Sequence, residues 1–349
     1  MTYSPKEGGR VVTRGRPINS SDTPQELGRP LVTVDGSGRP HRGIERGTDR
    51  LVGRHRQGRT TTWGKRLPLL PAVVFMLLTT QVPLGLTIWY SLENWSLDVP
   101  GSAKYIGFAN YANAIHNPVL LTAALNTIEL TIGVGTVSAI IATGVALLLN
   151  RRIVASRAVR SLIVAPFFVM TVAGALTWST LMYDPVYGTI DYILNVLGLH
   201  NSFPWLTRLP LLSIGVVLVW KWMPFMMLII YAGLRGQDID QLEAASVDGA
   251  GSTRKFVYIT LPYLRPYIEL ALLLGTVFLL QTFGAIYAVT QGGPGFATTN
   301  LAYLVYETVI TNSQVSSGAA IGILTVIGVT FVAVPLLRVL TVFMKGPAR

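Results

Sequence analysis

The feature that most restricts the fold of this chain is a series of apolar runs, twenty or more residues long, beginning near Leu67. A helix rises about 1.5 Å per residue, so such a run crosses a hydrocarbon layer about 30 Å thick. The composition agrees, because 50% of the 349 residues are hydrophobic and 13% are charged, against about 25% charged in soluble domains. We therefore expect an all-α polytopic membrane protein.

Six transmembrane helices are expected, with approximate limits 67–92, 118–149, 160–182, 209–234, 266–290 and 317–342. The positive-inside rule then decides their orientation. If the N-terminus is inside, the inner segments are 1–66, 150–159, 235–265 and 343–349. Together with flanking residues at the span ends, these segments hold 25 of the 28 Lys and Arg residues. Both termini are therefore predicted to be cytoplasmic.

Residues 1–66 differ from the rest of the chain. They contain 14 Lys and Arg against 6 Asp and Glu, with scattered glycines and prolines and no apolar periodicity. Such a stretch cannot bury enough surface to offset its ordering entropy, so we expect a disordered basic cytoplasmic tail. An arm for nucleic acid or anionic lipid is the alternative. It is less favoured because Tyr3 and Trp63 are the only aromatic residues there.

Few residues are available for covalent or metal chemistry. The chain has no cysteine, and its histidines (His41, His55, His116 and His200) are widely separated. No phosphate-binding loop, zinc-binding H-E-x-x-H or G-x-S-x-G motif occurs. We expect neither a metal site nor nucleotide hydrolysis on this chain.

The inner connection between the fourth and fifth spans has the sequence pattern of a helical hairpin. Residues 237–247 read as a short helix whose acidic first turn favours the positive end of the helix dipole. Gly249 and Gly251 allow a turn with positive φ, and Ser252 suits the N-cap of a second helix. Such a hairpin could fit into a groove on another protein. The same sequence pattern is also compatible with an exposed hairpin that has no partner.

This connection resembles the EAA loop of ABC importer permeases: E-A-A, three residues, Gly, nine residues, Ile, one residue, Leu-Pro. The motif falls on Glu243, Ala244, Ala245, Asp248, Gly249, Ile259, Leu261 and Pro262. Residues from about 67 to 342 resemble MalF/MalG-type carbohydrate permeases, most closely those for the sugar alcohols sorbitol and mannitol. The segments carrying this likeness are 164–170, 220–225 and 292–306.

The resemblance implies a division of labour between subunits in a bacterial cell membrane. A second six-span permease subunit would pair with this chain, and an extracellular substrate-binding protein would deliver a small carbohydrate. Two separate ATPase subunits would bind ATP and Mg, so no cofactor is expected on this chain. Glu243 would contact the ATPase, Ala244 and Ala245 would set the approach, and Gly249 would form the turn.

Two charged residues inside the predicted spans are candidates for the solute pathway, because a charge at mid-membrane is costly. Glu129 and Lys221 lie at similar depths from the outer span ends. They could form an ion pair, Lys221 could instead reach into a solute cavity, or both could serve packing. Residues suited to a hydroxyl-rich solute are found within the predicted fifth span: Gln281, Thr282, Phe283 and Tyr287.

Two other functional classes remain open. An ion- or proton-coupled secondary carrier should contain broken helices and buried carboxylates in both halves, whereas Glu129 alone is expected to be buried. An intramembrane enzyme would need paired catalytic residues, which the sequence lacks. The permease subunit of an ATP-driven importer, without catalytic activity of its own, is therefore the leading expectation.

Overall fold

The computed structural model describes residues 70–151, 156–198 and 203–344, with side chains as far as Phe331. The predicted basic tail lies outside the described residues. The chain divides into two units, Met1–Ala72 and Val73–Arg349. All the packing considered below belongs to the second unit.

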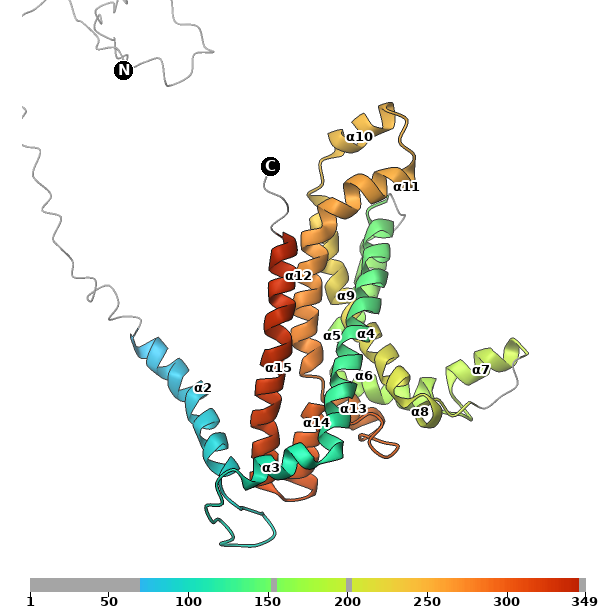
Figure 1. Ribbon diagram of the computed structural model, residues 1–349. Helices are drawn as coiled ribbons and strands as arrows, with labels where there is room; N and C mark the ends of the chain where they lie inside the picture. Colours follow the sequence, from blue (N-terminus) through green and yellow to red (C-terminus); the bar gives the residue numbers. More distant parts are fainter. Residues whose placement is uncertain (1–69, 152–155, 199–202, 345–349) are drawn as a thin grey trace, which may run out of the picture. The chain divides into compact units, whose positions relative to one another are not determined.

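The described part of the chain is helical (Figure 1). It contains no strand, only an isolated antiparallel bridge between Glu93 and Tyr105. The elements of the first half are α2 (Leu70–Ser91), α3 (Ala109–His116), α4 (Pro118–Leu149), α5 (Ser156–Phe168), α6 (Thr171–Thr177), the π-helical η2 (Trp178–Met182) and α7 (Thr189–Val196). Those of the second half are α8 (Trp205–Arg208), α9 (Pro210–Arg235), α10 (Ile239–Val247), α11 (Ser252–Lys255), η3 (Phe256–Thr260), α12 (Leu261–Leu280), α13 (Gly284–Val289), α14 (Leu301–Tyr306), η4 (Glu307–Thr311) and α15 (Val315–Met344).

Among the described residues, four helices are long and apolar enough to cross a membrane: α2, α4, α9 and the continuous helix Ser252–Leu280. A fifth is added if the bent pair formed by α5 and α6 with η2 counts as one span. The predicted second span coincides with α4, and α9 differs from the predicted fourth span by one residue at each end. Long apolar runs therefore predicted these two helices well.

Two of the predicted spans are interrupted. The third is broken, because Ala158–Phe168 and Thr171–Met182 meet at an angle of 102°. The prediction that the fifth continues to residue 290 is wrong, since α12 ends at Leu280 and the chain restarts as α13. Asn300 stabilises this interruption by donating from Nδ2 to the carbonyl of Thr282 at 2.5 Å. The carbonyl of Thr282 thus receives its hydrogen bond from a residue distant in sequence.

The core nearest the α10–α11 end is formed by α4, α9, α12 and part of α5. The face that α4 buries consists largely of small residues, including Ala139, Ala142 and Ala146, which allow close helix approach. Gly275 serves the same purpose on α12, because a Cβ there would overlap the methyl group of Met226. Met226 is fully buried.

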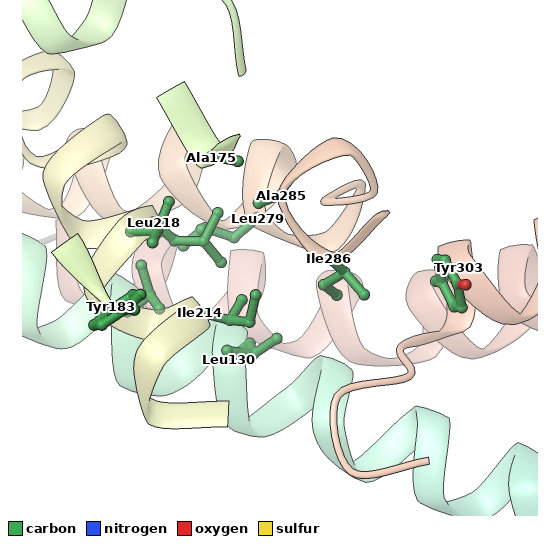
Figure 2. Close-up of a cluster of buried hydrophobic side chains, with 11 residues drawn as sticks. Leu130, Ala175, Tyr183, Ile214, Leu218, Leu279, Ala285, Ile286 and Tyr303 are labelled. Carbon is green, nitrogen blue, oxygen red and sulfur yellow. The ribbon is translucent and has the colours of Figure 1, made fainter. Parts of the chain in front are cut away.

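A second core lies toward the opposite ends of α4 and α9 (Figure 2). Leu130 of α4 and Ile214 and Leu218 of α9 form its centre. Ala175 of α6 and Ala285 of α13 also belong to this cluster. The bent segment α6 is therefore packed within the helical unit.

Candidate functional site

The α10 helix forms the first arm of the hairpin and begins at a cap that its own sequence supplies. The side chain of Asp238 accepts a hydrogen bond from the backbone N–H of Asp240 at 3.0 Å. The helix therefore starts at Ile239, two residues after the predicted start. None of its residues is buried, and even Ile239 and Val247 are exposed.

A left-handed residue closes α10. Gly249 has φ +79°, as predicted, and the N–H of Ala250 donates to the carbonyl of Ala245 at 2.9 Å. This arrangement satisfies carbonyls that the helix end would leave unpaired. Gly251, which could also have adopted a positive φ, has a φ of −66°. Gly251 rather than Ser252 is the N-cap of α11, so one left-handed residue suffices for the turn.

Two side-chain hydrogen bonds join the arms of the hairpin. Lys255 Nζ donates to Ser246 Oγ at 2.9 Å, which links α11 to α10 near the turn. Gln237 Nε2 donates to Thr260 Oγ1 at 3.2 Å at the base of the hairpin. These bonds hold the exposed arms in a defined relation to α9 and α12, beyond whose ends the hairpin projects (Figure 1).

The residues of the EAA motif lie on the surface of this hairpin. Exposed members are Glu243, Ala244, Asp248, Gly249, Leu261 and Pro262, whereas Ala245 and Ile259 are half-buried. Beside them an open pocket of about 380 Å³ is lined by Ala250, Arg254, Lys255, Tyr258 and Ile259. The acidic α10 and the basic α11 thus present charges of opposite sign on one small projection.

Lys221 lies in the middle of α9 and does not pair with Glu129. Its Nζ donates to the carbonyl of Phe167 at 3.1 Å and to that of Val169. Lys221 is buried, whereas Glu129 is exposed. The hypothesis of an ion pair is therefore wrong, because the break between α5 and α6 frees carbonyl oxygens that serve as the partners of the ammonium group.

Aromatic side chains surround this break. Phe167 stacks on Phe225 with ring centroids 5.3 Å apart, and Trp222 lies 6.0 Å from Phe167. On the other side of the break, Gly174 of α6 faces the ring of Trp220, which a Cβ would approach to 3.1 Å. Both arms of the broken helix therefore contact α9 beside Lys221.

The predicted solute residues gather around the start of α13 rather than on one continuous span. Phe283 and Tyr287 stack with ring centroids 5.5 Å apart, so these two side chains share a face. Tyr306 of α14 lies 5.0 Å from Phe283 and 5.4 Å from Tyr287. We call Phe283, Tyr287, Tyr303 and Tyr306 the aromatic group. Gln281 is exposed at the end of α12, and Thr282 is buried.

Tyr303 and Tyr306 of α14 belong to the aromatic group but were not predicted from the sequence as site residues. They belong to the segment 292–306, which carries part of the family likeness, but no local pattern placed them beside Phe283. Asn126 of α4 fixes this segment by donating from Nδ2 to the carbonyls of Phe296 and Thr299 at 3.1 and 2.9 Å. Tertiary hydrogen bonds therefore bring α14 to α13.

The buried carboxylate on the described spans is not the one that was expected. Glu269 of α12 is buried, and its Oε1 accepts from Arg265 Nε at 2.9 Å. Its Oε2 is buried without a hydrogen-bond partner among the described residues. In that part of the chain, no three His, Asp or Glu side chains gather as ligands for a metal ion.

Residues 131–345 match the family model "Binding-protein-dependent transport system inner membrane component". The chain belongs to this family. Members of the family are non-catalytic permease subunits of ABC transporters, and the ATPase activity lies on separate subunits. The matched region begins within α4 and includes the broken span, the hairpin and the aromatic group.

Individual relatives cover most of the permease. The "Probable ABC transporter permease protein y4oQ" of Sinorhizobium fredii is 35% identical over 77% of this chain and 87% of its own length. The "Trehalose/maltose transport system permease protein MalF" of Thermococcus litoralis is 32% identical over 78% and 92%. The fold is similar to that in a bacterial ABC transporter for alginate, with TM-score 0.67, 20% identity, and 81% and 96% of the two chains covered.

Proposed function

We propose that this permease subunit carries a sugar or sugar alcohol into the cell by alternating access, driven by ATP hydrolysis on separate subunits. The family, together with a relative named as a trehalose and maltose permease, supports a carbohydrate. Tyr287, the exposed member of the aromatic group, supports it independently, because an aromatic face suits the C–H surfaces of a sugar while the tyrosine hydroxyl group suits its oxygens.

The proposed assembly contains a second six-span permease subunit, two ATPase subunits that hold ATP and Mg, and an extracellular substrate-binding protein. In this proposal α15 completes six spans, and both termini lie in the cytoplasm of a bacterial cell. The basic residues support this orientation, because Arg235, Arg254, Lys255 and Arg265 gather around the hairpin.

The observation that carries the proposal is the exposed hairpin, whose arms are joined by two side-chain hydrogen bonds. Glu243 and Ala244 are exposed on α10, and the left-handed Gly249 directs the chain back toward α12. An exposed helix that is fixed at its base, with small residues beside a carboxylate, can enter a groove and transmit force. In the proposed complex Glu243 contacts a basic residue or backbone amide of the ATPase.

The test replaces Glu243 with lysine in the assembled transporter. We expect Glu243→Lys to leave the protein in the membrane but to abolish solute uptake, because the reversed charge would repel the basic partner. Gln241→Lys is the matched control, since Gln241 is exposed on the same helix but points about 200° away from Glu243. Normal uptake by Glu243→Lys, in cells without another carrier, would refute the coupling role.

A panel of polyols and disaccharides tested on the reconstituted transporter would identify the solute class. Uptake that requires ATP and persists without an ion gradient is expected. Uptake that follows an imposed proton or sodium gradient without ATP would instead indicate a secondary carrier, which the exposed position of Glu129 does not favour.

A further inference from the structure

The break between α5 and α6 leaves backbone groups unpaired in an apolar part of the chain. Pro166 lies within α5 and cannot donate a backbone hydrogen bond. Two residues later the helix ends, and the axis turns by 102° before α6 begins. Such a break in an apolar span requires other groups to satisfy the released carbonyls.

Lys221 supplies these groups from a neighbouring helix. One ammonium group binds two carbonyls on either side of the end of α5, those of Phe167 and Val169. A cation also suits this position electrostatically, because the C-terminal end of a helix carries partial negative charge. The ammonium therefore has both its hydrogen-bond partners and its charge compensation at the break.

A second cationic contact ties α5 to α9 further along. Arg160 Nη2 donates to the hydroxyl of Tyr231 at 2.7 Å, and its guanidinium carbon lies 4.6 Å from the centre of that ring. The contacts of Arg160 and Lys221 are ten residues apart on α9, about 15 Å at helical rise. Between them, α5 is fixed to α9 at two separate points.

The other arm of the break has an additional neighbour. Thr171 and Val172 of α6 contact the position of Gly284 at the start of α13, each at 3.5 Å from a Cβ placed there. The aromatic group begins at the adjacent residue, Phe283. The arm of the break formed by α6 therefore lies between α9 and the start of α13.

We propose that Lys221 is a positioning residue for transport that holds the break at its angle through the carbonyls of Phe167 and Val169. Together with the Arg160–Tyr231 contact, Lys221 makes α5 move together with α9. The α9 helix in turn leads into the hairpin. The link to transport rests on the proposed function, whereas the structural effect on the break does not.

The experiment measures the angle directly in the assembled transporter. The chain has no cysteine, so spin labels can be attached at cysteines introduced at Leu162 on α5 and Leu181 on η2, both of which are exposed. A second pair at Leu121 on α4 and Leu212 on α9, also exposed, reports whether the bundle is intact. Distances between the spin labels are measured by pulsed electron paramagnetic resonance, and solute uptake is measured in the same preparations.

Lys221→Met removes the ammonium but keeps most of the side-chain volume. We expect the distance distribution of the first pair to broaden or shift, the second pair to be unchanged, and uptake to fall about tenfold or more, because charged hydrogen bonds in a dry site are lost. Lys221→Arg, which retains donors and charge, should keep the distribution closer to that of the natural chain. Lys221→Gln provides an intermediate variant if Lys221→Met does not assemble.

Two results would overturn the inference. An unchanged distance distribution in Lys221→Met or Lys221→Gln would show that backbone and aromatic packing hold the break without the ammonium. A changed distribution with normal uptake would show that the angle does not serve transport. Neither result concerns the hairpin, so the proposed coupling role of Glu243 is tested separately.

Discussion

Gly249 and Gly251 offer a matched test of the hairpin turn. The two glycines flank Ala250, and a Cβ added at either position meets nothing within 4 Å. They differ in backbone conformation, because φ is +79° at Gly249 and −66° at Gly251. Replacement of each by alanine therefore separates the cost of a left-handed conformation from every steric effect.

The magnitude follows from this difference. An L-residue in the left-handed region costs about 1–2 kcal/mol, whereas alanine at φ −66° is unstrained. Gly249→Ala should weaken the native turn by this amount, roughly a factor of 5–30 in its population relative to open forms. Gly251→Ala should cost less than Gly249→Ala, because alanine is unstrained at φ −66° and its remaining cost is that alanine is a poorer N-cap than glycine.

The assay is the affinity of the permease complex for its ATPase subunits, measured together with uptake. If docking requires the closed hairpin and the turn is marginal, Gly249→Ala raises the dissociation constant up to about 5–30-fold, while Gly251→Ala raises it less. Gly249→Asn should lose less than Gly249→Ala, since asparagine tolerates the left-handed conformation. Equal effects of the two alanine variants would refute the reasoning from φ.

Two further predictions concern the α13–α14 region. Tyr287→Ala should raise the solute concentration for half-maximal uptake without changing ATPase docking, because it removes one stacking face from the aromatic group. Tyr192→Ala, at an exposed position, serves as its control. Unchanged solute affinity in Tyr287→Ala would dismiss this site. Asn300→Ala should lower the free energy of unfolding by about 1–3 kcal/mol, because it leaves the carbonyl of Thr282 unpaired in a buried site. Thermal unfolding in detergent checks this value, and Asn113→Ala, at an exposed position of α3, should change it little.

The hairpin could be predicted from the sequence because local chemistry decides most of its form. Acidic residues at the start of α10 and a glycine after its end are signals that act within a few residues. Gly251 shows the limit of this reasoning. Glycine permits a positive φ but does not require one, so the sequence indicates where a turn lies and not which glycine adopts the left-handed conformation.

The end of the fifth predicted span could not be found in the same way. Residues 281–290 continue the apolar composition of α12, and nothing local marks Leu280 as the last helical residue. The interruption is stabilised by Asn300, which lies eighteen residues beyond Thr282. Asn126, on another helix, fixes the segment that brings Asn300 to this position. These are tertiary contacts, and periodicity contains no information about them.

Lys221 illustrates a more general reason why the partner of a charge within a span is hard to predict. The sequence displays carboxylates as candidate partners, so Glu129 at similar depth was the visible choice. A broken helix creates acceptors that no residue type reveals, because they are backbone carbonyls whose helical donors are missing. At the break after Phe168 these carbonyls meet the ammonium of Lys221. A lone lysine in an apolar span, opposite a span containing proline, is therefore evidence for a helix break as much as for an ion pair.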